Sequence, residues 1–191
     1  MQKARILMRF EMDIIKTERL LLKKMKFENY IELFNIWNDN ELIKYTNHPY
    51  VETLEGSKKY ISEIIQWYMN SKSHFGPFIL YYEEKFVGFC GLDLKSESIN
   101  EFELFYIILR NYWGNGFATE VSKKLIGIGF EYLNAQRIIA EAFPENSLSW
   151  KLLEKIGMKK EGCIRREFFK DHKFHDLYIY SILKDEWIKK L

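Results

Sequence analysis

Residues 109–120 read LRNYWGNGFATE, with two glycines between an apolar run and an amphipathic one. The apolar run over residues 102–109 predicts a strand, and the apolar residues after the glycines recur with the period of a helix. They are Ala118, Val121, Leu125, Ile128 and Tyr132. The first N–H groups of a helix lack intrahelical acceptors, and the helix dipole adds roughly half a positive charge there. Because glycine lets the backbone approach a phosphate, this turn predicts an anion site. A plain strand-to-helix turn is the alternative.

The segments on either side of this turn predict a mixed sheet with helices on both faces. Apolar spacing indicates helices over residues 29–38 and 53–70, and a third from Asn146, an N-cap, to Gly157, a C-cap. Alternating or continuous apolar runs predict strands over residues 13–25, 77–82, 86–94, 102–109, 137–142, 159–169 and 174–183. Three antiparallel strands therefore precede the glycine turn, and a helix–strand–helix segment follows it. The fold class is α/β, a mixed sheet of about seven strands.

Composition limits the class of protein. The chain has 191 residues, 47% hydrophobic and 29% charged, which is typical of one globular domain. We expect that domain over residues 14–191, after a loose extension over residues 1–13. A net charge of +2 is too small to indicate a nucleic-acid or membrane partner, and no run of 18 apolar residues could span a bilayer. The start lacks the apolar core of a signal peptide, so we expect a cytoplasmic protein.

Four motifs in one order carry a family resemblance. Residues 113–120 resemble the acetyl-CoA pyrophosphate loop of the GNAT acetyltransferases, whose common form is Gln/Arg-x-x-Gly-x-Gly/Ala. Gly116 and Ala118 match it, and Trp113 replaces the leading Gln/Arg, as in the branch of ribosomal-protein and spermidine acetyltransferases. Residues 144–158 resemble the second cofactor segment, and residues 17–22 with Glu161, Gly162 and Asp176 resemble the opening and closing motifs. The resemblance covers about residues 14–187.

This resemblance implies the GNAT acyl-CoA N-acyltransferase fold and an enzyme that moves an acetyl group from acetyl-CoA to a primary amine. The amine would attack directly in a ternary complex, with no metal. The implied cofactor-binding residues are Ile108, Leu109, Trp113, Gly114, Asn115, Gly116, Phe117, Ala118, Thr119 and Asn146.

The chemistry requires a base and a proton donor. An amine attacks only when neutral, and at pH 7 only about one lysine-type amine in a thousand is neutral. By resemblance Glu103 is the base or acceptor anchor, acting through a water, although alternation puts Glu101 on the same face. Many relatives place a tyrosine as the thiolate's acid where this chain has Leu153. The resemblance therefore passes that role to Ser149, whose plainer interpretation is a first-turn helix serine.

Several alternatives stay open. Cys90 and Cys163 lack a histidine at motif spacing, so we expect inert thiols rather than a covalent route. The four histidines, His48, His74, His172 and His175, show no ligand spacing. Trp37, Tyr45, Trp67 and Tyr68 predict either core or an acceptor groove. The acceptor could be a protein N-terminus, a polyamine, an aminoglycoside or another small amine. Another acyl group such as succinyl, a non-catalytic acyl-CoA sensor and a homodimer are further hypotheses.

Overall fold

The computed structural model describes residues 12–70 and 74–189, and most of the predicted extension lies outside these residues. The chain begins with a hairpin of β1 (Ile14–Lys16) and β2 (Leu20–Lys24). The prediction of one strand over residues 13–25 was wrong here. Thr17 ends β1, because its backbone N–H donates to the Leu20 carbonyl at 3.0 Å and its hydroxyl accepts from the Leu20 N–H at 2.9 Å.

A series of helices follows this hairpin. A 3₁₀ turn, η1 (Phe27–Asn29), leads into α2 (Tyr30–Trp37), α3 (Asn40–Ile43) and α4 (Leu54–Asn70). The sequence did not predict α3, which has only four residues. Its N-cap is Asp39, whose carboxylate accepts from the backbone N–H groups of Glu41 and Leu42.

The remaining strands complete one eight-stranded sheet, one strand more than predicted because the first splits in two. They are β3 (His74–Tyr82), β4 (Lys85–Ser96), β5 (Glu101–Ile108), β6 (Arg137–Ala142), β7 (Lys159–Lys170) and β8 (Lys173–Leu183). Their order is β1-β2-β3-β4-β5-β6-β8-β7, and only β5 and β6 are parallel neighbours. Asp171 and His172 close the β7–β8 turn, both with positive φ, as two-residue hairpins prefer.

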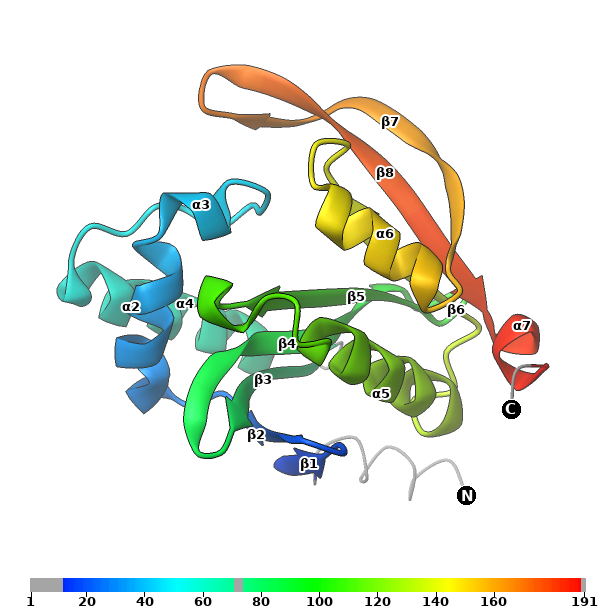
Figure 1. Cartoon of the computed structure of the whole chain (residues 1–191), viewed down its shortest axis with the longest axis horizontal. Helices are drawn as coiled ribbons and strands as arrows, with labels where there is room; N and C mark the ends of the chain where they lie inside the picture. The colour runs from blue at the N-terminus through cyan, green and yellow to red at the C-terminus, as the bar shows by residue number, and fades with distance from the viewer. Residues whose placement is uncertain (1–11, 71–73, 190–191) are drawn as a thin grey trace.

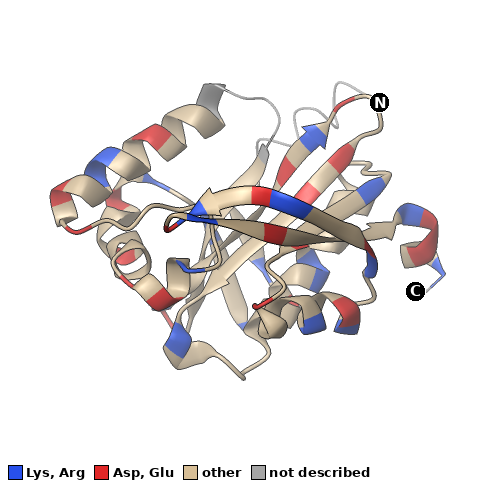
Figure 2. Cartoon of the chain, turned by 90° about the horizontal axis from the view of Figure 1, so that it is seen from above, with Lys and Arg blue, Asp and Glu red and all other residues tan. Residues whose placement is uncertain are grey.

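Helices cover both faces of the sheet, as the sequence predicts (Figure 1). After the 3₁₀ turn η2 (Arg110–Tyr112), α5 (Phe117–Glu131) and α6 (Ser147–Lys155) share one core with the sheet. A second core lies beneath α2, α3 and α4. A short helix, α7 (Lys184–Ile188), which the sequence did not predict, ends the described chain. Figure 2 shows acidic and basic residues interspersed over helices and strands, in keeping with the small net charge.

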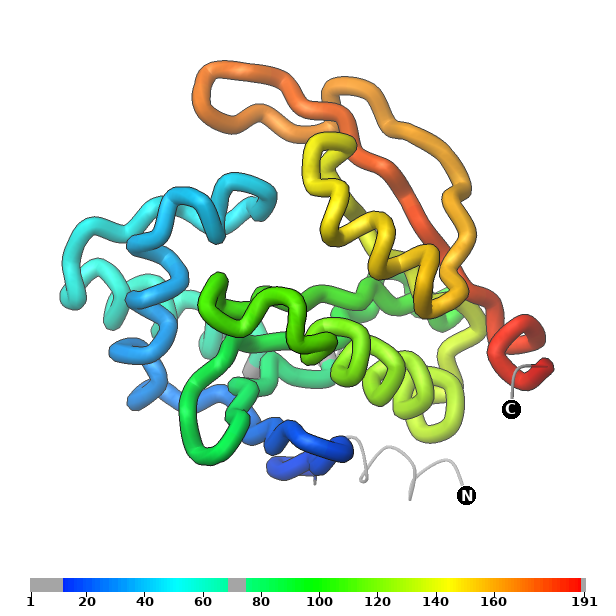
Figure 3. The backbone as a smooth tube through the Cα atoms, in the orientation of Figure 1, coloured from blue at the N-terminus to red at the C-terminus, as the bar shows by residue number. Residues whose placement is uncertain are grey.

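The parallel pair β5–β6 separates partway along its length. Residues 101–103 of β5 pair with residues 137–139 of β6, and β5 then continues to Ile108 without a β6 partner. Past that point β6 stays paired with β8. The backbone tube in Figure 3 shows the chain leaving the free end of β5, passing through the short turn η2 and entering α5. The sheet therefore opens on one side of the strand that feeds the turn.

Candidate active site

The opening between β5 and β6 is part of a cleft of about 980 Å³. One end of the cleft is formed by the turn before α5 and by the first residues of α6. The other end is formed by α4 and the loop after α3. Glu103 and Tyr106 of β5 and Glu141 of β6 line it between these two ends. The cleft therefore joins the predicted anion site to the helices in which the sequence predicts an acceptor groove.

The glycine turn presents unsatisfied donors to this cleft. Gly114 and Gly116 have φ values of 77° and 79°, which favour glycine because a Cβ would be strained there. Within the described residues, none of the backbone N–H groups of residues 114–119 donates to a protein acceptor. Gly114, Gly116 and Phe117 to Thr119 all line the cleft. Such a row of free donors at a helix N-terminus fits the phosphate groups of a nucleotide-like cofactor.

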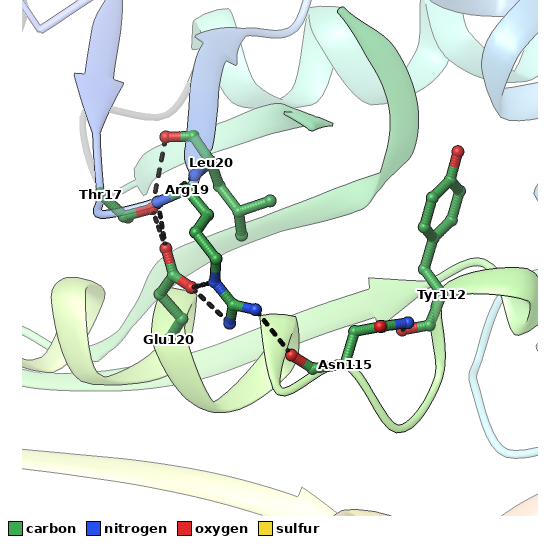
Figure 4. Close-up of polar contacts among 6 residues, drawn as sticks. All are labelled: Thr17, Arg19, Leu20, Tyr112, Asn115 and Glu120. Carbon is green, nitrogen blue, oxygen red and sulfur yellow. Dashed lines mark hydrogen bonds and ion pairs between the residues drawn. The ribbon is translucent and has the colours of Figure 1, made fainter. Parts of the chain in front are cut away.

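A clamp from the N-terminal hairpin holds this turn from behind (Figure 4). Glu120 accepts from the Thr17 hydroxyl at 2.5 Å, and from the backbone N–H and Nε of Arg19 at 2.8 and 2.7 Å. The Arg19 guanidinium also donates to the Asn115 carbonyl at 3.0 Å and lies 4.8 Å from the centre of the Phe117 ring. Partial burial raises the pKa of Glu120, but the hydrogen bonds from Thr17 and Arg19 and the charge of Arg19 hold it below its ordinary value. The motif over residues 17–22 thus fixes the position of the turn.

Eight of the ten predicted cofactor residues line the cleft: Ile108, Trp113, Gly114, Gly116, Phe117, Ala118, Thr119 and Asn146. Trp113 is held by its indole N–H, which donates to the Ile108 carbonyl at 2.7 Å. Leu109 instead packs against the core beneath α2 and α4. Asn115 turns its side-chain amide back to the carbonyls of Tyr112 and Trp113. These last two residues therefore shape the loop from outside the cleft.

The two candidate carboxylates differ in their position along β5. Glu101 lies where β5 and β6 are still paired and forms an ion pair with Arg137 at 2.9 Å, away from the cleft. Glu103 is the last residue of β5 with a β6 partner and lines the cleft. Its carboxylate lies 2.9 Å from the Lys95 amine, and its side chain is 21% exposed. Of the two, Glu103 is the one that a bound molecule in the cleft can reach.

Other acidic groups surround Glu103. Asp93, Glu141 and Glu167 also line the cleft. Burial, followed by the charge of Glu103, raises the pKa of Glu141, and Lys95 only partly offsets this. Burial raises the pKa of the Tyr68 hydroxyl, and the charge of Asp93 and a hydrogen bond to it raise it further. Four carboxyl groups therefore gather in this part of the cleft, and one of them, Glu103, is paired with Lys95.

Ser149 lies at the opposite side of the opening, in the first turn of α6. The Asn146 side chain caps this helix by accepting from the Ser149 N–H at 3.2 Å. The Ser149 hydroxyl is therefore not used by the cap, and it lies 3.1 Å from the Tyr106 hydroxyl. Leu153, at the place where many relatives carry a tyrosine, is fully buried. Asn146, Ser149 and Tyr106 all line the cleft.

The family follows from the match of the chain to known proteins. Residues 19–159, well over half of the chain, match the model of the acetyltransferase (GNAT) domain. The chain belongs to the GNAT acetyltransferases. A Bacillus licheniformis protein named uncharacterized N-acetyltransferase p20 is 34% identical over 176 residues, which are 92% of this chain and 99% of that relative. This GNAT enzyme is thus an acyltransferase of the N-acetyltransferase class.

Solved GNAT structures share the fold. RimL, a ribosomal L7/L12 alpha-N-protein acetyltransferase in complex with coenzyme A, superposes with a TM-score of 0.80 at 16% identity, over 91% of this chain and 99% of that one. Spermidine N-acetyltransferase from Vibrio cholerae, in complex with CoA and spermine, superposes with a TM-score of 0.77 at 20% identity, over 89% and 98%. At these identities the likeness concerns the architecture, including the mixed open sheet.

The aromatic, cysteine and histidine residues that the sequence singled out lie in different parts of this GNAT chain. Trp37 is fully buried, whereas Tyr45, Trp67 and Tyr68 line the cleft. Cys90 is buried, and burial raises the pKa of its thiol, while Cys163 is exposed on β7. His48 lines the cleft beside Tyr60.

Sequence reasoning missed Tyr106, Asp93, Glu141 and Glu167. All four lie within predicted strands. Asp93 and Glu141 each interrupt an apolar run, whereas Tyr106 belongs to such a run and Glu167 follows two arginines, so these two carry no comparable signal. Glu167 lines the cleft from the stretch of β7 between Ile164 and Phe168, where the register with β8 shifts. The residues inside this shift have no regular partner on β8, so alternation alone does not predict where the Glu167 side chain lies.

Described residues contain no helix that is both long and apolar enough to cross a membrane.

Proposed function

We propose that this N-acetyltransferase uses acetyl-CoA and acetylates a positively charged primary amine by direct attack in a ternary complex. The single observation that carries this proposal is the arrangement of the cleft. Free backbone donors lie at one end of the cleft, and a group of carboxylates lies beyond them, at and around the opening between β5 and β6. An anionic cofactor and a cationic acceptor would thus meet at this opening.

The turn before α5 supports the cofactor half of the proposal. The N–H groups of residues 114–119 would donate to the pyrophosphate, and Asn146 would contact the amide-containing arm. RimL and the Vibrio cholerae spermidine acetyltransferase, which share this fold, both hold coenzyme A. Acetyl-CoA supplies an activated acetyl group, so the chain itself has to place the amine, accept its proton and stabilise the departing sulfur.

Glu103 is proposed as the base, acting through a water, or as the anchor of the acceptor's ammonium group. It lies where the strands separate, and general bases typically contribute 10²–10⁴-fold in rate. Asp93, Glu141 and Glu167 favour an acceptor with a positive charge in addition to the reacting amine, because Lys95 only partly offsets the repulsion among the carboxylates. A polyamine fits this better than a protein N-terminus without neighbouring basic residues.

The test measures thiol release from acetyl-CoA with a panel of amines: a polyamine, a monoamine of similar length, peptides with neutral and basic second residues, and an aminoglycoside. We expect the highest kcat/KM with the multiply charged amines. Thiol release from succinyl-CoA but not from acetyl-CoA would support the rival acyl group. Tight acetyl-CoA binding without turnover on any amine would support a sensor.

Glu103→Gln tests the base. We expect kcat to fall by roughly 10²–10⁴-fold, with a smaller loss at high pH where the amine is already neutral. A higher acceptor KM at unchanged kcat would instead assign Glu103 to anchoring. Glu101→Gln is the matched control, since it removes a carboxylate two residues away that lies outside the cleft. Wild-type kcat and KM for Glu103→Gln at every pH would contradict both roles.

A further inference from the structure

We propose that Tyr106 is a positioning residue for the leaving group: its hydroxyl donates to the Ser149 oxygen and so directs the Ser149 proton toward the cofactor sulfur. This inference rests on the proposed acetyl transfer. It assigns a role to a strand tyrosine in place of the helix tyrosine that Leu153 replaces.

The proposed base and the proposed leaving-group residues lie on opposite faces of β5. Phe105 and Ile107 pack toward α2 and α4, and alternation puts Glu103 with them. Tyr106 packs against the other core, under α5 and α6, where Ser149 lies. The proposed base and the Tyr106–Ser149 pair are thus on opposite sides of the strand whose free edge borders the opening. A thioester between them would have its acceptor on one side and its sulfur on the other.

The pair is isolated within the described residues: neither hydroxyl has another protein hydrogen-bond partner. The 3.1 Å distance allows either one to donate. A phenol is the stronger donor of the two. Burial raises the pKa of Tyr106 to about 12, with the Ser149 hydrogen bond opposing, so its proton is present throughout the neutral range. When Tyr106 donates, the Ser149 proton is free to point into the cleft, and a chain of two hydrogen bonds strengthens its last member.

The step balances without any change in the protonation of the pair. The amine nitrogen forms a bond to the carbonyl carbon, the carbon–sulfur bond breaks, and the sulfur leaves with the electron pair as a thiolate. The amine gives its proton to water or to Glu103. The Ser149 hydroxyl donates a hydrogen bond to the thiolate, which later takes its proton from solvent. Among the described residues the Tyr106 hydroxyl hydrogen-bonds only to Ser149, so the role assigned to it acts through the serine.

The experiment is a double-mutant cycle of Tyr106→Phe and Ser149→Ala, with kcat and both KM values measured for the best amine. Tyr106→Phe should lower kcat by up to about tenfold, the effect of losing one hydrogen bond between two neutral hydroxyls, while the acetyl-CoA KM changes less than twofold. The double variant should be no slower than Ser149→Ala, because the tyrosine has no route except the serine. Wild-type kcat in Tyr106→Phe, or additive losses in the double variant, would overturn the role.

Tyr180→Phe is the matched control. It deletes another buried tyrosine hydroxyl that bonds to α6, at 3.0 Å from Glu154, but it lies outside the cleft. We expect its kcat to equal the wild-type value.

A second measurement keeps the ring and hydroxyl in place. Replacing Tyr106 with 3-fluorotyrosine makes the phenol a stronger donor, so kcat should hold or rise, and a fall would contradict the role. Wild-type enzyme that releases no thiol with any amine would overturn the proposed acetyl transfer and this role together. Normal turnover with an unaffected Tyr106→Phe would overturn the role alone.

Discussion

His48 is held in an aromatic pocket at the acceptor end of the cleft. Its ring centroid lies 5.6 Å from that of Phe89 and 6.4 Å from that of Trp37, and its Nδ1 lies 2.8 Å from the Tyr60 hydroxyl. Burial, with a smaller contribution from the Lys170 charge, lowers the pKa of His48 to about 4. The unfolded chain takes up a proton near the ordinary value of 6.5, and the folded chain takes it up only near 4. Folding therefore becomes less favourable as the pH falls through this interval.

His48→Phe should remove that dependence. The phenyl ring keeps the packing but takes up no proton. As the pH falls from 6.5 to 4, the wild type should lose unfolding free energy relative to the variant, by up to about 1.4 kcal/mol for each pH unit. Urea unfolding at a series of pH values measures it. His172→Asn, in the exposed β7–β8 turn where asparagine tolerates positive φ, is the control. Parallel stability curves for His48→Phe and wild type would contradict the prediction.

Alternation along β5 could not choose between its two glutamates, and the prediction of Glu103 came from the family resemblance. Alternation places Glu101 and Glu103 on one face, and both belong to the same strand. Only the length of the β5–β6 pairing, which ends at Glu103, separates a carboxylate at the opening from one paired with Arg137. The paired residues of the two strands are more than 30 residues apart in the sequence, and no local pattern encodes where their pairing ends.

At the scale of single elements, α5 begins with Gly116 as N-cap and without any side-chain cap. Its first N–H groups therefore stay free for a ligand, and the Thr17–Arg19–Glu120 clamp holds the turn instead. An added Cβ at Gly116 would meet only the Arg19 guanidinium, at 3.5 Å, so the protein itself leaves room there. What a side chain would occupy is the space that we assign to the phosphates.

Gly116→Ala should raise the acetyl-CoA KM at least tenfold, which corresponds to about 1.4 kcal/mol. The left-handed backbone at this position also costs stability, by roughly 1 kcal/mol. Gly157→Ala separates the two effects, because Gly157 also has positive φ, 92°, at the end of α6, and does not line the cleft. We expect similar losses of Tm in both variants and a raised KM only for Gly116→Ala. Equal KM values would count against the phosphate assignment.

Long, periodic elements were predictable, and short or irregular ones were not. The helices α4, α5 and α6 match their predicted segments, because each carries a full apolar stripe or clear caps. The four residues of α3 are too few to show a period, and the β1–β2 turn depends on one threonine. The bulge in β7 inserts extra residues without any glycine or proline to mark it.

At the scale of the whole molecule, Lys170 connects the two walls of the acceptor end. From the end of β7 its amine donates to the carbonyls of Ile43, Thr46 and His48, at 2.5, 2.9 and 3.4 Å. Beside it, the rings of Tyr45 and Phe143 lie 5.8 Å apart. These partners are more than 120 residues apart in the chain, so no sequence window could predict the contact. The order of strands and helices, in contrast, was enough to predict the mixed sheet.

Lys170→Met should leave these carbonyls without their donor, with a loss of about 1–3 kcal/mol in unfolding free energy. Because the loop that carries them lines the acceptor end, we expect the acceptor KM to rise and the acetyl-CoA KM to stay unchanged. Steady-state kinetics and thermal unfolding measure both. Lys173→Met, at the other side of the same turn and exposed, is the control. A change in both KM values would indicate a general distortion of the cleft instead.

Amides in the middle of a sheet normally exchange their hydrogens with deuterated water slowly, because each is bonded to a neighbouring strand. Beyond Glu103, β5 has a neighbour on one side only, although it is the fifth of eight strands. Amides of residues 104–108 that point away from β4 should therefore exchange quickly in the free protein and slow down with bound acetyl-CoA. Unchanged deuterium uptake in this peptide at saturating cofactor would contradict that. Hydrogen exchange at these central amides would thus measure whether acetyl-CoA is bound, even when no amine is being acetylated.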